Sequence, residues 1–225
     1  MDKPRRHYTH WDYDSAEKVA DAAIHVLGVV FAMAGAALLI ALAHGRIGAA
    51  EYAAAVVYAV SLLLALGASA AYNVWPVTRV KWLLRRFDHS AIYAFIAGTY
   101  TPFLAQLKMG FASVGLMIGI WVAAAIGMAV KLFLPGRFDR AAVGLYLVLG
   151  WSGVMIYEAV IKALPGTTLW LLVAGGVLYT LGVVFHAWRN LRFQNVIWHG
   201  FVLAAAVCHY GAVIDSLVLA RPLQA

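Results

Sequence analysis

The stretch VADAAIHVLGVVFAMAGAALLIALA, residues 19–43, determines the fold class of this chain. Its ionisable side chains, Asp21 and His25, both lie near its start, and apolar or small residues follow. A helix needs about 20 mostly apolar residues to cross a bilayer, so this stretch is long enough to span one. Six similar runs follow, at approximately 52–75, 89–107, 111–134, 141–163, 168–188 and 196–219.

The composition supports a membrane protein. The 225 residues are 64% hydrophobic and 12% charged, with a mean hydropathy of +0.82, whereas soluble domains carry about 25% charged residues. The alternating pattern of a membrane β-barrel is missing, and helices are the other structure that satisfies every backbone group in lipid. We therefore predict an all-α bundle of seven transmembrane helices over residues 19–220, preceded by a cytoplasmic interfacial tail at residues 1–18.

The net charge of +7 would suggest a nucleic-acid partner in a soluble protein. Here 13 of the 17 Lys and Arg residues lie in the N-terminal tail and in the second, fourth and sixth connections between the runs. Cytoplasmic loops carry such an excess, so we expect a cytoplasmic N-terminus, an external C-terminus and no nucleic-acid partner. The short connections leave little surface for a soluble protein partner. They favour a multi-pass protein of a plasma membrane, with a bacterial inner membrane as the expected location.

Polar residues gather at the ends of the runs that this topology places on the cytoplasmic side. At 1.5 Å rise per residue, all of them lie within roughly 10 Å of that boundary. Three pairs are spaced i, i+4, which puts both members on one helix face. We expect one intramembrane site made of Asp21, His25, Ser69, Asn73, Asp88, His89, Asn195 and His199.

A purely structural reading of these residues stays open. Side chains near a boundary can reach water or headgroups, so they cost less than at the bilayer centre. Asp88 would also suit the N-terminus of the third helix as a cap, and His89 would then face solvent. His209, about 15 Å from His199 by helix rise, fits a buried histidine bonded to a neighbouring helix.

Three segments resemble the haemolysin III family. They are DHSAIYAFIAGTYTPF at 88–103, GGVLYTLGVVF at 175–185 and NVIWHGFV at 195–202. That family is grouped with the progestin and adipoQ receptors, which have seven membrane helices, and it is distantly similar to alkaline ceramidases. The resemblance implies a haemolysin III-like membrane domain. In the family three histidines bind zinc, and the aspartate corresponding to Asp88 orients or activates a zinc-bound water.

Two of the three zinc-binding histidines implied by the resemblance are asparagine in this chain. The second-helix pattern reads Ser69-x-x-x-Asn73 and the seventh-helix pattern Asn195-x-x-x-His199, while Asp21 replaces an asparagine of the first-helix pattern. A neutral amide is a poor zinc ligand, so we expect no bound metal. Two alternatives are residual zinc and an oxygen-richer site, suited to manganese or iron, made of Asp21, Asp88, His25 and His199.

Three functions remain possible from the sequence. The first is sensing or binding of a membrane lipid or lipid-like ligand at the polar site. The second, implied by the similarity to ceramidases, is a metal-dependent hydrolase of membrane-lipid amide bonds, in which Asp88 is the base for a metal-activated water. Without a metal, Asp88 and His199 would act as the catalytic acid/base pair. The third is a cytolytic pore, which is suggested by the family name alone.

Overall fold

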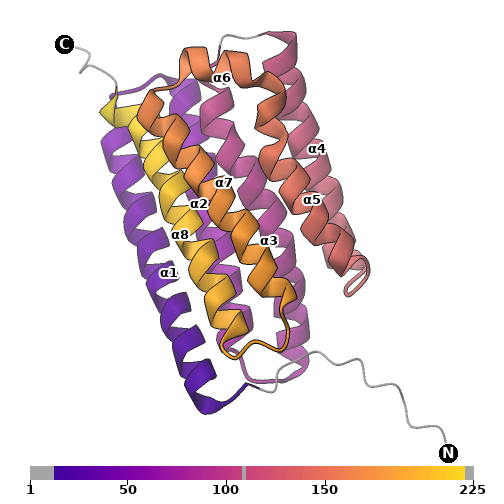
Figure 1. The fold of residues 1–225 in the computed structure, drawn as a ribbon. Helices are drawn as coiled ribbons and strands as arrows, with labels where there is room; N and C mark the ends of the chain where they lie inside the picture. Colours follow the sequence, from indigo (N-terminus) through magenta and orange to yellow (C-terminus); the bar gives the residue numbers. More distant parts are fainter. Residues whose placement is uncertain (1–12, 108–109, 221–225) are drawn as a thin grey trace, which may run out of the picture.

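The computed structural model describes residues 13–107 and 110–220, and within them it contains helices and no β-strand. The helices pack side by side as one bundle, with the start of α1 and the end of η2 at opposite ends (Figure 1). The elements are α1 (Ser15–Ala43), α2 (Ala49–Val74), α3 (Arg79–Leu104), α4 (Phe111–Phe133), α5 (Asp139–Trp151), η1 (Ser152–Ile156), α6 (Tyr157–Ala163), α7 (Gly166–Ala187), α8 (Gln194–Ile214) and η2 (Asp215–Leu219).

Six helical segments are long and apolar enough to cross a membrane. Five are α1, α2, α4, α7 and α8 extended by η2, and the sixth is the combined segment 141–163. Helix α3 has the length of a crossing, but the Lys and Arg residues of its first turns lower its hydropathy. The chain is therefore a multi-pass, all-helical membrane protein. Of the tail predicted at residues 1–18, residues 1–12 lie outside the described part.

Helix α3 begins at Arg79, nine residues before Asp88, so the prediction that Asp88 caps this helix is wrong. Lys81 attaches this charged segment to the end of α2. The Lys81 ammonium donates to the backbone oxygens of Tyr72, Asn73 and Trp75 at 2.9, 3.1 and 2.8 Å. The last turn of a helix leaves its carbonyls without intrahelical partners, and Lys81 provides a donor for these three. The contact fixes the angle between α2 and α3 at the end that carries the predicted site.

The fifth crossing is not one continuous helix, as the sequence predicted, but is interrupted by η1. Tyr100 of α3 provides the replacement hydrogen bonds. Its hydroxyl donates to the Gly150 backbone oxygen at 2.6 Å and accepts from the Gly153 amide at 2.9 Å. Backbone groups in lipid need such internal partners, so the break is stable beside α3.

Small residues allow α1 and α8 to pack closely. Gly28 of α1 faces Leu203, and Gly35 lies under the ring of Tyr210, whose hydroxyl donates to the Gly35 backbone oxygen at 2.9 Å. Close backbone approach of this kind drives helix association in lipid. Helix α8 also packs extensively against α7, and α1 against α2. Helix α5 makes thinner contacts with α3 and α7, and the space on this side of the bundle contains the cleft described next.

Candidate functional site at one end of the bundle

A cleft of about 1180 Å³ opens among α3, α5, α7 and α8. Ligand pockets have volumes of roughly 300–1,000 Å³, so the cleft is large enough for a ligand of lipid size. Its deeper wall contains apolar and aromatic residues, among them Phe95, Trp151 and Val202. Six of the eight predicted site residues line it: Ser69, Asn73, Asp88, His89, Asn195 and His199.

Two polar contacts attach the start of α1 to the start of α8. The Glu17 carboxylate accepts from the Phe193 amide at 2.8 Å, and Arg192 pairs with Asp14 at 3.1 Å. Asp14 and Glu17 also form a reciprocal capping box that starts α1. Phe193 has φ 60°, an uncommon conformation for a residue other than glycine. The hydrogen bond from its amide to the Glu17 carboxylate stabilises this conformation.

This attachment brings Asp21 and His25 of α1 against His199 of α8. The ring of His199 is hydrogen-bonded through Nδ1 to Asp21 Oδ1 at 2.8 Å, and His25 Nε2 lies 3.5 Å from Asp21 Oδ2. The two imidazole rings meet edge to face with centroids 4.3 Å apart. His25 is 6% exposed, and its Nε2 makes no hydrogen bond to any residue that the structure describes. Leaving a buried polar group without a hydrogen bond costs about 1–3 kcal/mol of stability, and His25 Nε2 is such a group.

Asn73 and Asn195, the two asparagines of the predicted site, contact each other. Asn195 donates through Nδ2 to Asn73 Oδ1 at 3.5 Å, a long hydrogen bond, and Asn73 Nδ2 donates to the Ser69 backbone oxygen at 3.0 Å. The contact joins α2 to α8.

Asp88 and His89 lie on the α3 side of the cleft. The Asp88 carboxylate interacts with the Ser69 hydroxyl and lies within electrostatic range of His25. His89 Nε2 is 4.0 Å from Asp88 Oδ2, and the His89 backbone oxygen accepts from the Tyr146 hydroxyl at 3.2 Å. Both residues therefore border the same space as His199, but they are not part of its contact with Asp21.

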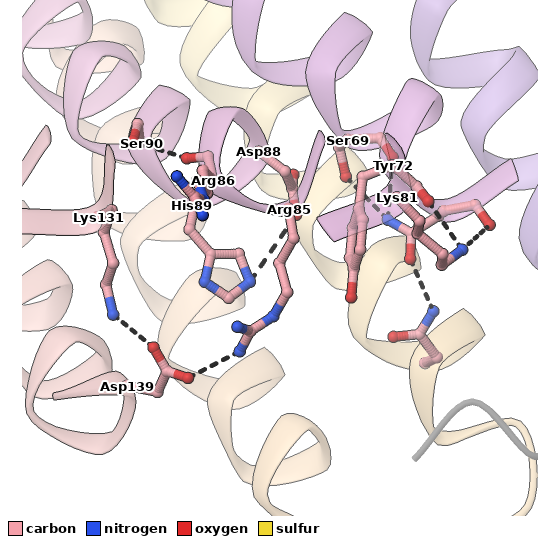
Figure 2. A network of polar contacts seen from close by, with 12 residues as sticks. Ser69, Tyr72, Lys81, Arg85, Arg86, Asp88, His89, Ser90, Lys131 and Asp139 are labelled. Atoms are coloured by element: carbon pink, nitrogen blue, oxygen red, sulfur yellow. Dashed lines mark hydrogen bonds and ion pairs between the residues drawn. The ribbon is translucent and has the colours of Figure 1, made fainter. Parts of the chain in front are cut away.

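The mouth of the cleft is cationic. Figure 2 shows Asp139 between Lys131 and Arg85, at 2.6 and 2.7 Å. Lys131 is 2% exposed, so its charge is held inside the protein by this carboxylate. Burial raises the pKa of Asp139, but the hydrogen bonds from Lys131 and Arg85 outweigh it and keep the pKa below its usual range. Six Lys and Arg residues line the cleft: Arg85, Arg86, Lys131, Arg137, Arg189 and Arg192.

From the sequence these cations were predicted only to set the topology, and their place in the site was missed. The signal was present, because the connections that contain them were predicted to meet at one end. That they lie near Asp88 and His89 could be seen only in the tertiary structure. Burial and the nearby Asp21 raise the pKa of Tyr13, another overlooked lining residue, to about 12, so its hydroxyl stays protonated and able to donate.

His209 is distant from this end, as predicted, and is bonded to a neighbouring helix. Its Nε2 lies 3.3 Å from the Leu172 backbone oxygen of α7. It lines the inner part of the cleft. The glycine at position 175 makes room for the ring, because a Cβ there would clash with His209.

A bundle of membrane-crossing helices with a polar cleft at one end defines a class, the multi-pass membrane proteins with an intramembrane site. Within that class, the profile of haemolysin-III related proteins matches residues 15–210. The chain belongs to the haemolysin III family.

Relatives in bacteria and in animals are similar over almost the same length. The hemolysin-3 homolog of Bacillus subtilis (strain 168) is 33% identical over 198 residues, which are 88% of this chain and 93% of that protein. Hemolysin-3 of Bacillus cereus is 34% identical, over 88% of this chain and 90% of that protein. The human monocyte to macrophage differentiation factor is 29% identical, over 88% and 83%. The names of the two bacterial relatives refer to haemolysis and that of the human relative to cell differentiation, so family membership leaves the activity open.

Proposed function

We propose that this protein binds a membrane lipid or lipid-like ligand that carries an anionic headgroup. The observation that supports this most directly is the polarity of the cleft, which has basic residues at its mouth and apolar and aromatic residues in its depth. An amphiphile matches that gradient, since its chain would replace lipid contacts and its headgroup would stay near the boundary. The ligand class is a bilayer component and not a soluble metabolite.

The charge of the mouth favours an anion over a neutral headgroup. The six Lys and Arg residues of the lining face three acidic ones, Glu17, Asp88 and Asp139. The Arg86 Nε atom is buried and has no hydrogen-bond partner among the described residues. Arginine donates in a planar fork that suits phosphate and carboxylate groups. An anionic headgroup would therefore find a donor that the protein itself leaves unused.

The proposed site faces the cytoplasmic leaflet of a plasma membrane. The distribution of Lys and Arg supports this orientation, and so does the position of the basic connections around the mouth. A green fluorescent protein fused after the C-terminus should stay dark and alkaline phosphatase at the same position should be active. Fluorescence without phosphatase activity would contradict the orientation.

Lipid binding can be tested with a blocked cleft. Leu147→Trp adds bulk to the lining, whereas Val148→Trp adds the same bulk one residue away, where the side chain is 68% exposed. Purified wild-type protein and the Val148→Trp control should retain a co-purifying anionic lipid in native mass spectrometry. Leu147→Trp should retain at least tenfold less of this lipid than the wild-type protein. Equal retention by both variants would contradict binding in the cleft.

A second candidate function is hydrolysis of a lipid amide, and one specific observation favours it. Asp88 and His199 line the same cleft from α3 and α8, so an acid and a base are both presented to a bound ligand. Turnover of a fluorescent lipid amide in detergent tests this function. Asp88→Asn should reduce turnover by at least 100-fold, and a wild-type rate equal to that of Asp88→Asn would exclude Asp88 as a catalytic group.

A further inference from the structure

We propose that Asp21, His25 and His199 form a binding site for one divalent transition-metal ion, with zinc as the ion that best suits the donors. This site uses the first helix, not the two asparagine positions at which the family resemblance implies zinc-binding histidines. It overlaps the proposed lipid-binding cleft only at His199, because neither Asp21 nor His25 lines the cleft.

The spacing of the donor atoms suits a metal. One ligand atom from each residue can be chosen such that all three lie within 4.8 Å of one another. His199 Nδ1 and His25 Nε2 lie 2.8 and 3.5 Å from the two Asp21 carboxylate oxygens. Tetrahedral zinc with bonds of about 2.0–2.1 Å places its ligands about 3.4 Å apart, which lies within this range. Two imidazoles and one carboxylate form a ligand set that catalytic zinc sites use, with a fourth position left open.

The unsatisfied nitrogen of His25 argues against a purely hydrogen-bonded triad. In such a triad each imidazole would bond to the carboxylate, and His199 does so at 2.8 Å. His25 Nε2, although buried, makes no hydrogen bond with Asp21 at 3.5 Å or with any other described residue. A cation shared by the three side chains would satisfy this nitrogen, and the carboxylate would balance part of the ion's charge.

The substitutions relative to the family pattern are consistent with a moved site. Asn73 and Asn195 bond to each other and to Ser69, so their amides are engaged away from the cluster. Asp21 supplies the negative charge that the family's asparagine at this position would lack. His199 is shared by the old and the new positions, and His25 is already buried beside it. Two imidazole ligands are thus missing at positions 73 and 195, and a carboxylate ligand is added at position 21.

Metal content measures this site without any activity assay. Wild-type protein, purified in detergent without chelators and loaded with Zn²⁺, should contain about one zinc per chain by elemental mass spectrometry. Asp21→Asn and His199→Gln should each reduce the content at least tenfold. His209→Gln, which changes a buried histidine of the same helix outside the cluster, should keep it. Zinc below about one-tenth per wild-type chain would overturn the proposal.

A second variant and a second measurement separate the new position from the family's. Asn195→Ala should keep the zinc, because Asn195 is outside the cluster. Retention in Asp21→Asn together with loss in Asn195→Ala would place the metal at the family positions and overturn the proposal. In wild-type protein stripped with EDTA, Zn²⁺ should raise the melting temperature, and Mg²⁺, which prefers oxygen ligands, should not. An equal response to both ions would also overturn it, and this measurement does not depend on a variant that folds.

Discussion

The two ends of the bundle hold polar side chains of similar kinds and use them differently. At the end far from the cleft, Thr168 donates to Asp215 at 2.6 Å and Gln106 donates to Ser216 at 3.1 Å. These pairs join α7 and the loop after α3 to η2 beside the buried Leu217. At the cleft end, buried atoms of His25 and Arg86 have no hydrogen-bond partner among the described residues, and the buried hydroxyls of Tyr58 and Tyr179, further along the helices, have none either.

The difference indicates which end serves structure and which serves function. The two polar pairs at the far end satisfy each other and so hold the helices together there. Buried groups left without partners are costly, and proteins keep such groups where a ligand or ion completes them. This contrast supports the proposal that ligands bind at the open end, and each prediction below tests one side of it.

The largest effect is expected at the cleft end, for Asp139→Ala. The change removes the carboxylate beside Lys131, which is 2% exposed, and leaves a buried ammonium without its counterion. Breaking a buried pair costs roughly 3–5 kcal/mol. Because Asp139 is itself 37% exposed, we expect about 2–3 kcal/mol, measured by thermal unfolding in detergent.

The matched control for that variant is Glu158→Ala, which removes a carboxylate from the surface pair with Lys162. Both partners are mostly exposed, at 67% and 76%, and exposed pairs contribute about 0.5 kcal/mol or less. A loss of equal size in the two variants would mean that the charges around the cleft are no more structural than those on the surface.

A smaller effect is expected at the closed end, for Thr168→Val. Thr168 is fully buried, and its loss leaves the Asp215 carboxylate without that donor, at a cost of about 1–2 kcal/mol. Thr167→Val, at the exposed neighbouring position, should change stability by less than about 0.5 kcal/mol. Lipid retention should be unchanged in both, since neither residue lines the cleft. Loss of lipid from Thr168→Val would show that the two ends are coupled.

A still smaller effect is the response of the cleft end to acid. The pKa of Asp139 is lowered in the folded protein, so its contribution to stability is complete above its unfolded pKa of about 3.9. That contribution is lost as the pH falls through the folded value. The melting temperature should therefore drop on acidification below about pH 4, and it should drop less in Asp139→Asn. If the melting temperatures of the two proteins fell in parallel, Asp139 would not contribute to the loss of stability in acid.

The smallest expected effect tests the cytolytic function that the relatives' names suggest. If the pairs at the closed end seal the bundle, vesicles containing the protein should keep an entrapped dye as well as empty vesicles do. Dye release that increases with protein content would show that a path crosses the closed end. Thr168→Val should then release dye faster than Thr167→Val.

The sequence predicted the helices and the grouping of their ends because both follow from local patterns. Apolar runs set the crossings, and the i, i+4 spacing placed Asp21 and His25 on one face toward His199. The start of α3 at Arg79 could not be predicted from hydropathy, since the charged first turns of this helix interrupt the apolar run. Their contact with the end of α2 through Lys81 is tertiary. The separation of Asp88 from the cluster likewise depends on packing angles between helices.

The interruption of the fifth crossing at η1 affects how that crossing fits a bilayer. A 3₁₀ segment rises about 2.0 Å per residue and an α-helix about 1.5 Å, so the five residues of η1 add about 2.5 Å of length. The hydroxyl of Tyr100, on a different helix, supplies the bonds that make this extension possible. A substitution to phenylalanine there would favour a shorter fifth crossing, matched to a thinner membrane.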